Sequence, residues 1–361
     1  MKAAKIRTVL ASGVLVAGVL GTGLVASGAG AAKTTGSHKT TTTTLKKPKP
    51  VNLSGVTLNI GDISEQVELP LQASGEIYPL NTNGLYGVKG YPFKLQFTQF
   101  VAGPEALAGI VGGSIDLAVS ADTPVIFAES QGIKFKTVGV RLPNLPGADF
   151  AIVLPKNSQI TSLAELKGLT ISAQTSTINE YFALQALASV GLNEHNVTVD
   201  NLTPALAEAA LASGAIQAAV LPQPYVALEV LSGDKVLTTG SGFIDGYEFL
   251  DASQSALNIP AKSAAIGDFL TLLGTADQWG AANTATLTQD IATAYSLPLS
   301  LAGPLLTDSA SNFVPINATV INATQAEATA FYNNNELPSP VNATSIFDAR
   351  YNSIIAPFVK S

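Results

Sequence analysis

The chain of 361 residues contains no cysteine and only two histidines. The absence of cysteine excludes disulfides, thiolate metal ligands, a cysteine nucleophile and the acylated cysteine of a lipoprotein. His38 lies in a threonine-rich tract and His195 in a polar loop that we place at the surface, so neither fits a Ser–His–Asp arrangement. We therefore expect no catalytic residues, no metal site and no cofactor, and we do not expect an enzyme.

Charge is also scarce, at 12% of residues against 47% hydrophobic residues, with a formal net charge of −7. No basic stripe with interleaved aromatic residues is present, so nucleic-acid binding is not expected. The spacings HExxH, DxDxDG, GxxxxGK[ST] and a strand-linked GxGxxG are absent as well, which argues against zinc, calcium and nucleotide sites. What remains is a chain suited to holding a small polar molecule.

Residues 1–32 have the pattern of a signal peptide. Three basic residues precede the apolar stretch Val9–Val25, and Ala29–Ala31 offers a small-residue cleavage site. We predict an exported protein, located in the periplasm or on the outer face of the membrane or cell wall, and not a lipoprotein. Retention of the apolar stretch as a membrane anchor stays open. No later apolar run is long enough to predict another membrane span.

The rest of the chain divides by composition. Residues 33–50 are rich in Thr, Lys and Pro and predict a tether without a packed core. The remainder is long enough for two lobes. We assign residues 51–145 and 243–361 to a first lobe, whose C-terminal part from about Tyr247 we expect to be helical, and residues 146–242 to a second. We expect a monomer.

The stretch Ala102–Ala128 predicts a helix, a buried strand and a second helix. Pro104 suits a first helical turn, and Asp122 or Thr123 is the expected N-cap of the second helix. The segment Gly113–Val119 recurs as Gly214–Val220, again followed by a proline-containing turn. Chance similarity is the alternative to two lobes of similar construction.

Further strands and helices are predicted from alternating apolar and polar residues, helix-capping residues and glycines that end helices. Strands are predicted at 56–60, 93–97, 115–119, 135–140, 150–154 and 169–173, and C-terminal helices at 262–273, 281–295 and 325–333. Thr177 and Glu180 form a capping-box pattern that opens a helix closed by Gly191. Since this helix follows a strand directly, the Ser176 and Thr177 hydroxyls either bind a ligand or only cap the helix.

Between about Leu58 and Phe358 the chain resembles the sulfonate/nitrate/taurine type of ABC-transporter substrate-binding protein, an NMT1-like group. The resemblance is carried by AGPEALAGIVGGSIDLAVSADTPVIFAESQGI, IVLPKNSQITSLAELKGLTISAQTSTINEYFALQALASVGL, ALASGAIQAAVLPQPYVALE and ELPSPVNATSIFDARYN. It implies an α/β, type II periplasmic-binding-protein fold with two lobes, two crossings and a central cleft. It also implies closure by a hinge motion and a membrane permease with its ATPase as partners.

The resemblance places the ligand on five turns, which agree with the strand ends chosen above. The candidate ligand-binding residues are Gly61, Asp62, Ser64, Ala102, Gly103, Ser120, Asp122, Thr123, Arg141, Thr175, Ser176, Thr177, Asn179, Gln223 and Tyr225. Arg141 is the nearest strong cation, unless it is only a hinge-surface residue. An Asp62–Asp122 carboxylate pair is conceivable, but no spacing requires it.

Two departures from the family concern the cleft. Gln174–Thr177 stands where many relatives have Lys-Gly-Ser-Ser, and Leu221–Gln223 where they often have an aromatic residue and an acid. These changes predict a cleft low in charge, in which helix N-termini and hydroxyls hold an organosulfonate or a related oxyanion. Two alternatives are a ligand sensor or surface module, and a pyrimidine-precursor enzyme on the same scaffold, which would want histidines that are missing here.

Overall fold

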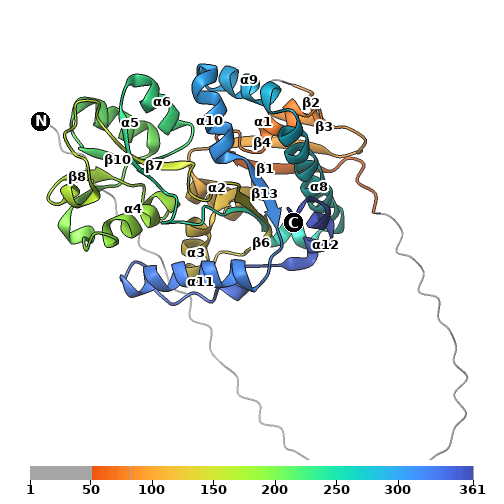
Figure 1. The fold of residues 1–361 in the computed structure, drawn as a ribbon. Coiled ribbons are helices and arrows are strands. Elements are labelled where there is room, and N and C mark those ends of the chain that lie inside the picture. Colours follow the sequence, from red (N-terminus) through yellow and green to blue (C-terminus); the bar gives the residue numbers. More distant parts are fainter. Residues whose placement is uncertain (1–50, 82, 361) are drawn as a thin grey trace, which may run out of the picture. The chain divides into compact units, whose positions relative to one another are not determined.

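The computed structural model describes residues 51–81 and 83–360, so the predicted signal peptide and tether lie outside the described residues. Within this part, two β-sheets with flanking helices form the core (Figure 1). No helix of the described ranges is long and apolar enough to cross a membrane.

The larger sheet has eight strands in the order β13-β6-β12-β5-β1-β4-β3-β2. Its strands are β1 (Thr57–Ile63), β2 (Ile77–Pro79), β3 (Leu85–Val88), β4 (Lys94–Phe100), β5 (Leu117–Ala121), β6 (Phe135–Pro143), β12 (Glu248–Ser253) and β13 (Ser311–Val314). Strand β1 pairs in parallel with β4 and β5, which brings the carboxyl ends of three strands to one edge. The turns that follow β1, β4 and β5 therefore lie together.

Helices cover both faces of this sheet. They are α1 (Glu68–Ala73), α2 (Gly103–Val111), α3 (Asp122–Ser130), α7 (Gln254–Asn258), α8 (Pro260–Ala282), α9 (Thr284–Ala294), α10 (Leu299–Ser309), α11 (Ala318–Asn333) and α12 (Asn352–Ile355). Leu58, Leu95 and Phe269 are fully buried in one core, and Phe249 and Phe331 in the core on the other face. This apolar burial is the main force that fixes the edge where the turns meet.

The smaller sheet has five strands in the order β11-β7-β10-β8-β9. Its strands are β7 (Phe150–Leu154), β8 (Thr170–Ser172), β9 (Thr198–Asp200), β10 (Ala218–Pro222) and β11 (Lys235–Thr239), and its helices are α4 (Ile178–Ala188), α5 (Pro204–Ser213) and α6 (Tyr225–Ser232). Two of the short 3₁₀ turns, Leu163–Leu166 and Glu194–Asn196, belong to it, and three more, Ala343–Ser345, Ala349–Tyr351 and Ala356–Phe358, follow α11. Figure 1 shows this group of elements in yellow to green, apart from the larger sheet.

The predicted strands all form, with boundaries displaced by a few residues, and so do the three predicted C-terminal helices. The repeat is structural: Gly113–Val119 leads into β5 and Gly214–Val220 into β10, and each strand is followed by a turn and a helix. His195 lies at the surface, as expected, with 84% of its side chain exposed.

The expectation of an all-helical C-terminal part is wrong, because β12 and β13 belong to the larger sheet. β12 pairs with β5 and β6, and all but one of its residues are buried, so its sequence does not alternate. β13 is an edge strand that pairs with β6. The chain forms one more strand, β11, before it returns to the larger sheet, and β11 pairs with β7.

The two chain segments that join the sheets pack closely against each other. Gly147 lies in the first segment, with φ +71°, and Gly240 lies in the second. A Cβ atom on Gly147 would lie 2.6 Å from the carbonyl carbon of Gly240. A glycine is therefore required here both by the backbone conformation and by the space.

Candidate functional site

A cavity of about 1100 Å³ lies between the elements of the two sheets. Each of the five predicted turns contributes to its wall. The candidate residues that line the cavity are Ser64, Ala102, Gly103, Ser120, Arg141, Thr177, Asn179 and Gln223. The convergence follows from topology, since these turns end strands that share one edge of each sheet.

Two helices begin at the cavity wall with alanine as the N-cap residue. The N-cap of α2 is Ala102, and that of α3 is Ala121 instead of the predicted Asp122 or Thr123. A Cβ on Gly103 would lie 2.5 Å from Cγ of Pro124, so the backbone approaches α3 closely. In α3 the Asp122 Oδ1 accepts the Thr123 N–H at 3.0 Å and Pro124 has no N–H, so it is the first turn of α2 that presents backbone N–H groups suited to a negatively charged group.

Two of the candidate hydroxyls at the wall, those of Ser120 and Thr177, are engaged inside the protein. Ser120 Oγ donates to Asp251 Oδ2 at 2.5 Å. Thr177 Oγ1 donates to the Gln174 carbonyl at 2.7 Å and accepts from the Asn179 N–H at 3.2 Å, as the N-cap of α4. These hydroxyls therefore hold the turns in shape.

The remaining candidates do not line the cavity: Gly61, Asp62, Asp122, Thr123, Thr175, Ser176 and Tyr225. Asp62 is fully buried and accepts the N–H groups of Ile63 at 2.8 Å and Glu68 at 2.9 Å, which fixes the turn into α1. Asp62 and Asp122 make no contact with each other; Asp122 lies beside Glu327 of α11. Burial, together with the charge of Asp122, raises the pKa of Glu327, which also accepts a hydrogen bond from the Thr123 hydroxyl.

In the smaller lobe, three candidates shape turns behind the wall. Ser176 has φ +59° and donates its N–H to Glu180 Oε2 at 2.7 Å. The Thr175 N–H donates to Asn201 Oδ1 at 3.0 Å, and Tyr225 is the first residue of α6. Glu180 accepts the N–H of Ser176 and not that of Thr177, so the capping box predicted for Thr177 and Glu180 does not form.

Arg141 lines the cavity, but its charge is already paired. Its Nη2 donates to Asp277 Oδ1 of α8 at 2.7 Å, and its Nη1 donates to Glu248 of β12. The side chain is 5% exposed, so it is a buried residue and not one of the hinge surface. Two carboxylates on one guanidinium leave a negative charge, and Arg141 is consequently a poor anchor for an anion.

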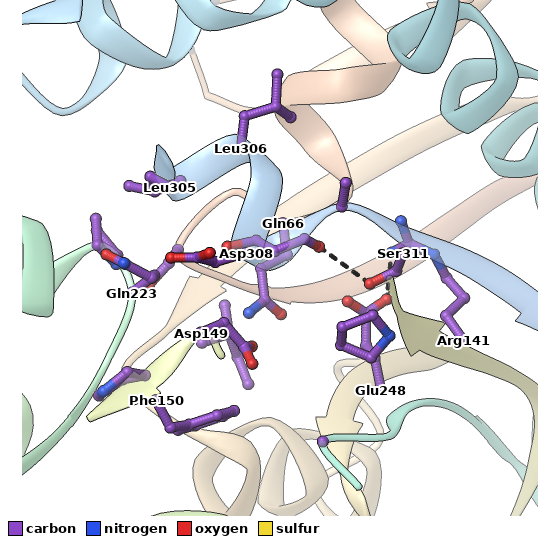
Figure 2. A pocket seen from close by; sticks show the side chains of 18 of the residues that line it. Gln66, Arg141, Asp149, Phe150, Gln223, Glu248, Leu305, Leu306, Asp308 and Ser311 are labelled. Atoms are coloured by element: carbon purple, nitrogen blue, oxygen red, sulfur yellow. Dashed lines mark hydrogen bonds and ion pairs between the residues drawn. The ribbon is translucent and has the colours of Figure 1, made fainter. Parts of the chain in front are cut away.

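Several wall residues were not predicted from the sequence. Asp308 and Leu305 come from α10, Leu287 and Thr288 from α9, and Asp149 precedes β7. Figure 2 shows Asp308 beside Gln223, whose side chain is hydrogen-bonded to it. No local motif marks these positions, because α9 and α10 reach the cavity only through the long-range packing of the C-terminal helices.

Burial changes the protonation of the wall carboxyls. It raises the pKa of Asp149 to about 7, and the charges of Glu248 and Asp308 act in the same direction. Burial likewise raises the pKa of Asp308, and the hydrogen bond from Gln223, which lowers this pKa, offsets only part of the effect. Within the described ranges, no group of three or more His, Asp or Glu side chains could hold a metal ion.

Comparison with known proteins decides the family. A family model described as NMT1/THI5 like matches residues 95–240. A curated aliphatic sulfonates-binding protein of Escherichia coli is 30% identical over 256 residues, which are 70% of this chain and 79% of that protein. The chain belongs to the aliphatic sulfonate-binding protein family. Relatives of this kind are ligand-binding components of transporters, and the chain is a binding protein, not an enzyme.

Solved structures agree with this assignment. The alkanesulfonate-binding protein SsuA from Xanthomonas axonopodis pv. citri, bound to MOPS, has a TM-score of 0.70 at 27% identity; the match covers 82% of this chain and 99% of SsuA. The periplasmic aliphatic sulphonate binding protein SsuA from Escherichia coli has a TM-score of 0.68 at 29% identity, with 81% and 98% covered. The fold is accordingly the two-lobed α/β fold of periplasmic binding proteins.

Proposed function

We propose that this SsuA-like chain is the extracytoplasmic solute-binding component of an ABC importer and binds a small organosulfonate in the cavity. The observation that carries the proposal is the convergence of five strand-end turns on one cavity whose wall includes the start of α2, where the N-cap alanine leaves backbone N–H groups without a side-chain cap. Membership of the sulfonate-binding family supports the same ligand class.

In this proposal the sulfonate oxygens lie at the first turn of α2. A helix N-terminus presents unpaired N–H groups and a partial positive charge, which together bind an anion without a cationic side chain. This matters here because Arg141 is held by Glu248 and Asp277. The apolar side chains Leu287, Leu305 and Phe150 would cover the hydrocarbon part of the ligand.

After the ligand binds, the two lobes close by rotating about the joining segments, and the closed cleft buries the ligand. In the proposed system the closed protein delivers its ligand to a membrane permease, and the associated ATPase drives uptake. Export by the predicted signal peptide and a monomeric state belong to the same proposal.

The test is a thermal-shift screen of the full chain followed by calorimetry. We expect methanesulfonate to hexanesulfonate or their substituted forms to raise Tm, since a ligand at 100 times its Kd stabilises the folded state by about 2.7 kcal/mol. Sulfate, nitrate and the matching carboxylates serve as comparison ligands. A protein that no sulfonate stabilises would refute the proposed ligand class.

A matched pair of variants locates the binding site. Asn179→Ala removes a side chain from the wall, whereas Asn193→Ala removes an exposed asparagine from a loop outside the cavity. We expect the first to weaken sulfonate binding at least tenfold and the second to leave it unchanged. Equal effects of the two changes would argue against this cavity.

A further inference from the structure

The wall of the cavity carries more negative than positive charge. Its carboxyl groups are Glu65, Asp149, Glu248, Asp277 and Asp308, whereas its cationic side chains are Arg141 and Lys360. Arg141 is shared between Glu248 and Asp277, and Lys360 Nζ donates to Asn144 Oδ1 at 2.8 Å. Among the described residues, Glu65, Asp149 and Asp308 therefore have no cationic partner.

Buried acceptor atoms on the same wall also lack donors within the described part of the chain. Gln174 and Asn179 are 7% and 5% exposed, and neither Gln174 Oε1 nor Asn179 Oδ1 receives a hydrogen bond. Asp149 Oδ1 is likewise buried without a partner. A buried oxygen that receives no hydrogen bond is unfavourable, so a ligand that donates to these side chains once they turn toward the cavity would be favoured.

These acceptors lie near one another through the topology of the smaller sheet. Asp149 precedes β7, Gln174 follows β8 and Gln223 follows β10, and β10 pairs with both of the other strands. The Gln223 N–H donates to the Asp149 carbonyl at 2.7 Å, which joins two of these positions directly. Asp308 reaches the same place from α10 across the cavity, beside Gln223 in Figure 2.

A simple alkanesulfonate suits this wall less well than a ligand that also donates hydrogen bonds, because Arg141 Nε is the one cationic donor atom there that is buried without a partner in the described part of the chain. Such an alkanesulfonate would bring a second negative charge into a cavity that already has unpaired carboxylates, and its methyl end has no hydrogen to donate. A protonated amine has the opposite properties, since it carries a positive charge and three donors.

From this we infer that the ligand carries a protonated amino group in addition to its acid group, so that the cavity selects aminosulfonates over plain alkanesulfonates. The ammonium lies at Asp149 and Asp308, with the Gln174 and Asn179 oxygens as further acceptors, and the sulfonate lies at the start of α2. This inference rests on the proposed function and narrows its substrate class.

The experiment compares ligands that differ only in the amino group. Calorimetry at pH 7 with the full chain uses 3-aminopropanesulfonate, propanesulfonate and propylamine. We expect the aminosulfonate to bind at least tenfold more tightly than propanesulfonate. Propanesulfonate binding as tightly or more tightly would overturn the inference and leave the proposed function intact. Failure of both sulfonates to bind would overturn the proposed function itself, and the inference with it.

Variants then test the assigned carboxylates. Asp308→Asn is expected to weaken the binding of 3-aminopropanesulfonate at least tenfold, while the binding of propanesulfonate is unchanged or tighter. Asp149→Asn should act in the same direction. Asp290→Asn, on α9 but outside the wall, is the control and should change neither ligand. Circular dichroism establishes that each variant is folded, and Asp308, near the end of α10, is the change that perturbs the core least. An unchanged preference in Asp308→Asn would overturn the assignment.

Discussion

Arg141 Nη2 lies 2.7 Å from Asp277 Oδ1, and this ion pair joins β6 of the larger sheet to the long helix α8. Glu248 of β12 accepts from the other terminal nitrogen of the same guanidinium. The side chains of all three residues are 15% exposed or less. Arg141 therefore serves mainly to neutralise two buried carboxylates, although the sequence alone suggested it as the cation of the ligand site.

Replacing this guanidinium is expected to be costly. Arg141→Met leaves Glu248 and Asp277 buried without a counter-charge, and breaking a buried pair in this way costs about 3–5 kcal/mol. Urea unfolding measures the loss. The control is Arg350→Met, which removes an exposed arginine from its pair with Asp348 and should cost no more than about 1 kcal/mol. A similar small loss in both variants would contradict the structural role of Arg141.

The close packing of the two joining segments predicts that Gly147→Ala strongly lowers the stability of the folded protein. An alanine there would be strained by φ +71° and would place its Cβ 2.6 Å from the Gly240 carbonyl. Gly191→Ala is the matched control, because Gly191 has φ +72° and open space around it. The control should lose about 1–2 kcal/mol of stability from the backbone conformation alone. Gly147→Ala should lose more in the same urea measurement; equal losses would show that the close contact is unimportant.

Asp251 predicts an unusual dependence of stability on pH. Burial raises its pKa to about 7, although Thr137 Oγ1 donates to it at 2.6 Å and Ser120 donates as well. The folded state then holds a proton that the unfolded state releases near the ordinary aspartate pKa of 3.8, so this carboxyl favours folding at low pH and loses that contribution as pH rises through about 7.

Asp251→Asn should remove this contribution. We expect the variant to be no more stable than the parent at pH 5 and more stable than it at pH 8. Urea unfolding at the two pH values makes the comparison, with Asp290→Asn as the control. Parallel stability profiles for the Asp251 variant and the parent would contradict the prediction.

Two adjacent aromatic residues on α11 should differ sharply in how much each contributes to stability. Phe331 is fully buried and packs edge-on against Phe127, with ring centroids 5.0 Å apart, whereas Tyr332 is 43% exposed. Phe331→Ala should cost about 3–5 kcal/mol, from lost burial and the cavity left behind. Tyr332→Ala should change stability by no more than about 0.5 kcal/mol. Comparable losses in thermal unfolding would mean that α11 does not pack as described.

Much of the fold could be predicted because its signals are local. Alternation, caps and glycine stops identified β1, β4, β5, β7 and α4, and the order of strand, turn and helix placed the turns at one edge. β12 could not be found in this way, because the buried Asp251 interrupts its apolar run and no alternating pattern replaces that run.

The candidate site was predictable in part for the same reason. The turns around Gly103 and Asn179 follow strands and could be found from the sequence. The partners of Arg141 and the position of Asp308 depend on α8, β12 and α10, which come from distant parts of the chain. Their contacts arise only from tertiary packing, which composition and periodicity do not specify.

The contact between Gly147 and Gly240 limits how the two sheets can move relative to each other. The two backbones have no room to approach each other further, and the Gly240 N–H donates to the Phe150 carbonyl at 2.9 Å, so the segments are also joined by a hydrogen bond beside this contact. We expect a swing of the smaller sheet to turn about this place, where the two segments lie side by side. A pair of dyes on opposite sides of the cavity would follow such a swing from empty to loaded protein.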